Sequence, residues 1–183
     1  MILYIDACAR ENSRTRRLAE ALLTRLQDEV SHIRLFNMNW EVTDENYLRK
    51  RDALIAEGLF DDDMFAPARQ FAQADTVVIA APYWDLSFPA VLKQYIEAIN
   101  VLGITFEYTE DGFPRGLCKA DKLYYVMTAG GNFVPEEFGY GYIRSLSENF
   151  YGIKDVRLIK ATGLDIYGAD AEAILQDAIK EIS

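Results

Sequence analysis

The chain has 183 residues, with 19 Lys and Arg side chains against 29 Asp and Glu, and a formal net charge of −10. Half of the residues are hydrophobic, which is enough for a continuous core, and the length fits a single domain over residues 1–183. The acidic balance argues against a protein that binds nucleic acid or anionic membrane, because both partners require a basic surface.

Few residues of the types that bind metals occur in the chain. Cys8, Cys118 and the only histidine, His32, are too few and too scattered for a zinc site, so no metal is expected. His32 is expected at the surface. No uninterrupted apolar stretch approaches the roughly 18 residues of a membrane-spanning helix. Two unpaired cysteines favour a reducing compartment, so the cytoplasm is the expected location.

Short apolar runs alternate with segments of helical periodicity from the start of the chain. The first run, residues 2–5, predicts a strand, and a helix is predicted from Arg14. Leu18 falls on the apolar face of this helix, whereas Arg16 falls on the face expected to meet solvent. The chain therefore opens as strand, loop and helix.

The same two patterns predict the remaining elements. Further strands are expected at residues 32–36, 76–81, 123–127 and 156–161. Helices are expected within 43–74, in two pieces broken around 58–63, after Pro89, and at about 139–151 and 169–182. Five strands alternating with helices predict an α/β fold with a parallel sheet covered on both faces. In such folds ligands bind beyond the carboxyl ends of the strands.

Three loops at that edge have unusual sequences, and the first of them spans residues 8–15. It lacks the glycines of known nucleotide-binding loops, but it provides cations and hydroxyls just before a helix, where backbone N–H groups also favour a phosphate. The candidate phosphate-binding residues are Arg10, Ser13, Arg14 and Thr15. A helix cap formed by Ser13 or Thr15 within a solvated turn would explain the same residues.

The second and third loops, 82–89 and 128–133, could hold a flat ring. Aromatic side chains stack on conjugated rings, and paired glycines allow the backbone to come close to a planar ligand. The candidate residues are Pro82, Tyr83, Trp84, Asp85 and Leu86, with Thr128, Ala129, Gly130 and Gly131. For the second loop the alternative is a turn whose aromatic side chains cap the core. For the third loop the alternative is an ordinary tight turn. A phosphorylated flat ring fits all three loops, and flavin mononucleotide (FMN) is the first candidate.

A longer ordered match begins in the second loop. Residues 81–89 read Ala-Pro-Tyr-Trp-Asp-Leu-Ser-Phe-Pro, and they are followed by Leu-Lys-Gln-Tyr-Ile at 92–96 and Gly-Ile-Thr-Phe-Glu-Tyr-Thr at 103–109. In these blocks, and over nearly its whole length, the chain resembles the flavodoxin-like NAD(P)H:quinone oxidoreductases and the FMN-dependent NADH azoreductases.

The resemblance implies a flavodoxin-like three-layer sandwich with a five-stranded parallel sheet in the order 2-1-3-4-5. It also implies a homodimer that carries hydride from NADH or NADPH through FMN to a quinone, azo or related acceptor. The flavin carries the chemistry, so no catalytic side chain is expected. The resemblance places the phosphate at residues 13–15 and the ring at 82–86 and 128–131. Tyr108, which matches an aromatic of the family, and Phe133 are the predicted substrate-pocket residues.

Two residues depart from the family pattern. Asp85 stands where the azoreductases usually have Asn, and Trp84 replaces a smaller aromatic. A carboxylate beside the flavin would disfavour a negatively charged reduced ring. Asp85 thus leaves open a domain that keeps the fold without flavin. The negative charge suits a second alternative, an FMN electron carrier without direct NAD(P)H turnover.

Overall fold

The computed structural model describes residues 1–182, which are built around one sheet of five parallel strands. The strands are β1 (Ile2–Asp6), β2 (Val30–Arg34), β3 (Thr76–Ala80), β6 (Lys122–Thr128) and β7 (Asp155–Ala161). Their spatial order is β2-β1-β3-β6-β7. This is the order 2-1-3-4-5, so the predicted α/β fold is confirmed.

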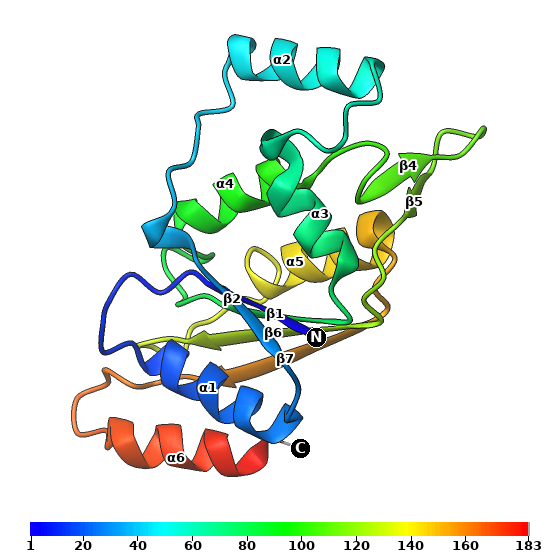
Figure 1. The fold of residues 1–183 in the computed structure, drawn as a ribbon. Coiled ribbons are helices and arrows are strands. Elements are labelled where there is room, and N and C mark those ends of the chain that lie inside the picture. The colour runs from blue at the N-terminus through cyan, green and yellow to red at the C-terminus, as the bar shows by residue number, and fades with distance from the viewer. Residues whose placement is uncertain (183) are drawn as a thin grey trace.

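Helices cover both faces of the sheet (Figure 1). One face carries α1 (Arg14–Leu26) and α6 (Ala171–Glu181), and the other carries α3 (Ala66–Gln73), α4 (Ala90–Ile99) and α5 (Tyr140–Leu146). Each face has its own apolar core, because successive side chains of a strand point to opposite sides. All five residues of β1 are buried, as expected for a central strand.

Local sequence signals determine where the helices near the carboxyl edge begin. Ser13 is the N-cap of α1, and its hydroxyl accepts a hydrogen bond from the N–H of Arg16 at 3.3 Å. Of the two predicted caps, the structure therefore uses Ser13. Asp170 caps α6 in the same way, since its carboxylate accepts from the N–H of Ala173 at 3.0 Å.

The structure differs from the prediction in several elements. β2 begins two residues earlier than predicted and gives way at Arg34 to a 3-10 turn, Leu35–Asn37. A hairpin of β4 (Phe106–Tyr108) and β5 (Pro114–Gly116) was not predicted, because three-residue strands carry too little alternation to recognise. Short turns of 3-10 and π type extend two helices, at Asp63–Phe65 and Ser147–Tyr151.

Two further features concern exposure. The helix α2 (Glu45–Ala56) has no fully buried residue and lies away from the sheet (Figure 1). The side chain of Arg16, predicted to face solvent, is only 12% exposed, because it forms an ion pair with the fully buried Asp6. Within residues 1–182 no helix is both long and apolar enough to cross a bilayer.

Candidate functional site

The loops after β1, β3 and β6 meet at the carboxyl edge of the sheet and enclose a cavity of about 160 Å³, here called the edge cavity. Nine predicted residues line it: Arg10, Ser13, Arg14, Pro82, Tyr83, Trp84, Thr128, Ala129 and Gly130. Three residues that were not predicted also line it: Ala9, Asn12 and Asp165. Segments far apart in sequence thus form one site where the topology places ligands.

Thr15 lies behind the edge cavity and does not line it. It is buried in the first turn of α1, and its hydroxyl lies 2.7 Å from the hydroxyl of Thr128 at the end of β6. This hydrogen bond joins the first loop to the third. Thr15 therefore supports the wall of the cavity from within the protein.

The two arginines of the first loop have different surroundings. Arg14 donates to the carbonyl of Leu164 at 3.2 Å and to the carboxylate of Asp165 at 2.7 Å. Arg10 is exposed, and no acceptor within residues 1–182 pairs with its side chain. Arg10 is thus the cation of this loop that is available to a ligand, while Arg14 connects the loop to the segment after β7.

The segment after β7, residues 162–168, forms a fourth wall that was not predicted from the sequence. Its backbone is hydrogen-bonded to the third loop: the N–H of Gly163 donates to Gly131 and the N–H of Asp165 donates to Gly130, at 3.0 and 2.9 Å. A Cβ atom at Gly130 would collide with the Asp165 carboxylate, so any other residue there would displace that carboxylate from its present position. The polar sequence directly after the last strand, at the same edge, was the signal that could have revealed this wall.

The tip of the second loop is a tight turn with an unusual backbone. Trp84 and Ser87 exchange two backbone hydrogen bonds, at 3.1 and 2.8 Å, and the two residues between them have positive φ. Asp85 has φ 50° and Leu86 has φ 67°. Aspartate tolerates this left-handed region, but leucine rarely adopts it, so the turn stores strain beside the site. Both side chains are exposed and lie outside the lining of the edge cavity.

Three further predicted residues do not line the edge cavity. Phe133 is 79% exposed, and Gly131 contributes only its backbone to the neighbouring wall. Tyr108 is 55% exposed on the β4–β5 hairpin, which projects at the end of the molecule away from the carboxyl edge (Figure 1). Within one chain, therefore, Tyr108 does not reach this cavity.

Cys8 offers no reactive thiolate at this edge. Its side chain is fully buried, and burial raises the pKa of the thiol to about 12, so it stays protonated at neutral pH. Among residues 1–182 there is also no cluster of three or more His, Cys, Asp or Glu side chains that could hold a metal ion. The residues that line the edge cavity therefore offer hydrogen-bond donors and aromatic surfaces, without a reactive thiolate among them.

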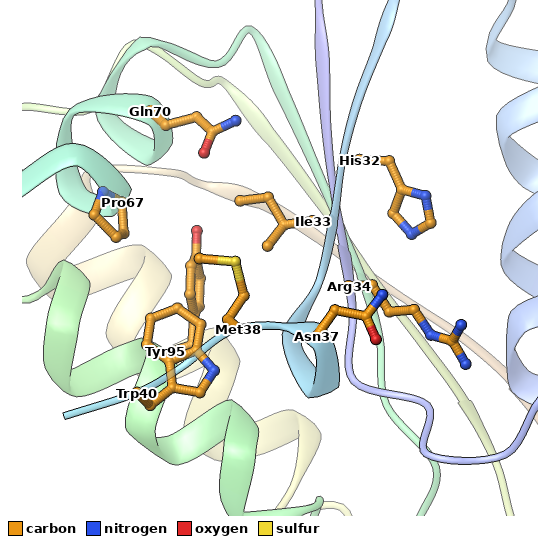
Figure 2. Close-up of a pocket in the computed structure, with 9 residues that line it drawn as sticks. All are labelled: His32, Ile33, Arg34, Asn37, Met38, Trp40, Pro67, Gln70 and Tyr95. Atoms are coloured by element: carbon orange, nitrogen blue, oxygen red, sulfur yellow. The ribbon is translucent and has the colours of Figure 1, made fainter. Parts of the chain in front are cut away.

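A larger cavity of about 430 Å³ lies between β2 and the helices α3 and α4 (Figure 2). Its lining includes Met38, Trp40 and Tyr95, whereas His32 and Arg34 point to the opposite side of β2 in the same view. This cavity shares no residue with the edge cavity and brings no charged groups together. The edge cavity is therefore the candidate functional site.

Comparison with known proteins gives consistent results. The family described as having a flavodoxin-like fold matches residues 1–183. An FMN-dependent NADH:quinone oxidoreductase 2 of Clostridium acetobutylicum is 37% identical over 98% of this chain and 94% of its own length. An FMN-dependent NADH:quinone oxidoreductase of Coprothermobacter proteolyticus is 35% identical over the same shares.

Solved structures agree with these relatives. An azoreductase from Bacillus anthracis superposes with a TM-score of 0.84 at 25% identity, covering 99% of this chain and 95% of the other. A second structure from that species is described as an FMN-dependent NADH-azoreductase in complex with FMN. It superposes with a TM-score of 0.82 at 23% identity, covering 99% of this chain and 94% of the other, which shows a similar fold.

Proposed function

The chain belongs to the flavodoxin-like family of FMN-dependent NADH:quinone oxidoreductases, and we propose on this basis that it is such an enzyme, built as a single domain. It would transfer hydride from NADH or NADPH by way of FMN to a quinone, azo or related small-molecule acceptor. The observation that carries this proposal is the edge cavity, in which a basic first loop, an aromatic second loop and a glycine-containing third loop meet.

The donors at the amino end of α1 fit the phosphate of FMN. The backbone N–H groups at the start of this 13-residue helix carry partial positive charge, Ser13 adds a hydroxyl, and Arg10 adds a full charge. The edge cavity is smaller than a whole FMN molecule. It would therefore hold the phosphate and the adjoining chain, and the ring would lie against its rim.

The rim offers suitable surfaces for a flat ring. Trp84 is 41% exposed and provides a stacking surface, and the backbone N–H groups of Gly130 and Gly131 have no acceptor within residues 1–182. Bound FMN would supply the two-electron chemistry. These free N–H groups would stabilise negative charge on its reduced ring, in the way that oxyanion sites do. The exposed position of Asp85 leaves its carboxylate in water, away from the cavity lining.

We also propose that the enzyme acts as a homodimer in the cytoplasm. Tyr108 and Phe113, on the projecting β4–β5 hairpin, are 55% and 70% exposed, and exposed aromatic side chains on a projection are typical of a contact surface. A second copy could bring Tyr108 to the edge cavity, which its own chain does not do. The free thiols of Cys8 and Cys118 suit a reducing compartment.

Flavin spectroscopy tests the enzymatic proposal. We expect the purified protein to bind FMN, and anaerobic NADH or NADPH to bleach the visible flavin band, which a quinone then restores. Sedimentation equilibrium of the same sample should give twice the mass of the chain. A protein that never binds FMN would exclude the whole proposal. Binding without bleaching would instead favour an electron carrier, which the charge of −10 suits.

A further inference from the structure

We propose that Arg16, paired with Asp6, is a positioning residue that gives the first loop the backbone shape needed to bind the phosphate of FMN. This inference rests on the proposed function, since it concerns the phosphate half of the same site. Arg16 itself does not line the edge cavity. It would act through residues 8–12, whose conformation it controls.

The first step is a buried ion pair at the end of β1. Asp6 is fully buried, and its carboxylate accepts from Nε of Arg16 at 2.7 Å. The other oxygen of Asp6 accepts from the backbone N–H of Cys8 at 2.8 Å. A buried carboxylate is stable only when it is paired and hydrogen-bonded, and here the two contacts use both of its oxygens. The pair therefore holds both Arg16 and the start of the first loop.

The second step is the use of the remaining donors of Arg16. The guanidinium group donates to three backbone carbonyls of the first loop: those of Cys8 at 2.9 Å, Arg10 at 3.0 Å and Glu11 at 2.7 Å. One planar side chain thus holds three carbonyl oxygens of a four-residue segment directed toward its guanidinium group. Charged hydrogen bonds of this kind are stronger than neutral ones, so they fix the loop firmly.

The third step follows from peptide geometry. No peptide bond in residues 1–182 is cis, and in a trans peptide the N–H points opposite to the C=O. With three carbonyls turned inward, the N–H groups of Ala9, Glu11 and Asn12 must point away from Arg16. None of these three N–H groups has an acceptor within residues 1–182, and Ala9 and Asn12 line the edge cavity. Outward N–H groups, successive here at Glu11 and Asn12, can form a concave site for an anion.

Arginine suits this task better than lysine. Its guanidinium carries five donors in a fixed plane and can hold a carboxylate and several carbonyls at once. Lysine could keep its charge opposite Asp6, but its single ammonium group could not hold three spread carbonyls. Arg16→Lys should therefore preserve the buried charge pair and loosen the loop.

Arg17 provides a matched control. It is the next residue of α1, and its side chain pairs with Glu172 of α6 at 2.7 Å and forms no hydrogen bond to the first loop. Arg17→Gln removes the same charge as Arg16→Gln at nearly the same place in the sequence. A difference between the two variants therefore reports the loop contacts of Arg16 and not the loss of a positive charge.

The test is a titration of each apo-protein with FMN and with riboflavin, which has the same ring but no phosphate. Flavin fluorescence reports the binding in both titrations. We expect Arg16→Gln to weaken FMN binding about 10- to 100-fold, Arg16→Lys to weaken it roughly 10-fold, and neither to change riboflavin binding more than about 3-fold. Arg17→Gln should change both affinities by less than about 3-fold.

Other outcomes separate the hypotheses. If the parent protein binds neither flavin, the proposed function fails and this inference fails with it. If the parent prefers FMN to riboflavin and the Arg16 variants keep that preference, only this inference is overturned. Equal losses of both flavins would show that Arg16 supports the fold alone. If Arg16→Gln does not fold, two other variants decide the question by their affinity for FMN relative to riboflavin. They are Arg16→Lys and the double variant Asp6→Asn/Arg16→Gln, which leaves no unpaired buried charge.

Discussion

At Gly130 the third loop and the segment after β7 come into direct contact. Because a Cβ atom there would collide with the exposed carboxylate of Asp165, Gly130→Ala must displace that carboxylate and disturb its pair with Arg14. We expect a loss of at most about 1 kcal/mol in the free energy of unfolding, the scale of a disturbed exposed ion pair, with weaker FMN binding. Urea unfolding and a flavin titration measure the two effects.

The neighbouring glycine is the control for this prediction. A Cβ atom at Gly131 would lie 4.0 Å from its nearest neighbour, the backbone nitrogen of Phe133, so Gly131→Ala should be nearly neutral for stability. Shortening the obstacle, in Gly130→Ala/Asp165→Ala, should restore part of the lost stability. Equal effects of the two single glycine variants would contradict the steric explanation.

At the scale of elements, α1 and α6 are joined across their exposed surfaces by a bidentate ion pair. Arg17 donates to both carboxylate oxygens of Glu172, at 2.9 and 2.7 Å, and these bonds, with a further hydrogen bond from Gln176, lower the pKa of Glu172 from 4.5 to about 2. A carboxyl whose pKa is lower in the folded state stabilises the fold above its unfolded pKa and loses that effect as the pH falls. The contribution of the Glu172 carboxylate to the free energy of unfolding should therefore be complete above about pH 5 and lost by about pH 2.

Glu172→Gln tests this linkage. The variant should have a lower urea midpoint than the parent at pH 7, and the difference should shrink as the pH is lowered from about 4.5 toward 2, where the Glu172 carboxyl of the parent becomes neutral like the amide of the variant. Glu20→Gln, on α1, is the control because Glu20 forms no ion pair within residues 1–182. A stability difference that does not depend on pH would rule out the ion pair as its cause.

Elements with strong periodicity could be predicted from the sequence, and contacts between distant residues could not. The buried strands β3 and β6 and the edge they share are visible in the apolar runs, so three of the four walls of the edge cavity were predicted. The periodicity of α1 assigned Arg16 to solvent, because a helical pattern says nothing about the buried carboxylate of Asp6 on a neighbouring strand. The short hairpin was missed because its three-residue strands show too little alternation, and the wall after β7 because backbone hydrogen bonds to the distant third loop define it.

For the whole molecule, the structure changes the meaning of the net charge of −10. The basic segment 10–17 could have reversed the negative field locally, but three of its four arginines are already paired with carboxylates. The pairs are Arg14 with Asp165, Arg16 with Asp6 and Arg17 with Glu172. Only Arg10 has no such partner within residues 1–182. An incoming FMN phosphate therefore meets one free cation on a strongly negative protein.

This arrangement predicts how FMN association depends on salt. At about 0.01 M ionic strength charges act over roughly 30 Å, so the phosphate is repelled by the whole protein, whereas at about 0.15 M they act over roughly 8 Å and the free charge of Arg10 dominates. FMN should therefore bind the apo-protein faster at the higher ionic strength. Stopped-flow fluorescence measures the association rate constant.

Arg10→Gln should lower that rate constant at about 0.15 M by roughly 3-fold or more, because it removes the one arginine of segment 10–17 that has no carboxylate partner within residues 1–182. Arg49→Gln changes the net charge equally but lies on α2, away from the carboxyl edge (Figure 1), and it should have little effect at that ionic strength. If added salt slowed association instead, the attraction by Arg10 would outweigh the repulsion by the net charge of −10 even at low ionic strength. Equal effects of the two variants would mean that FMN responds to the net charge and not to Arg10.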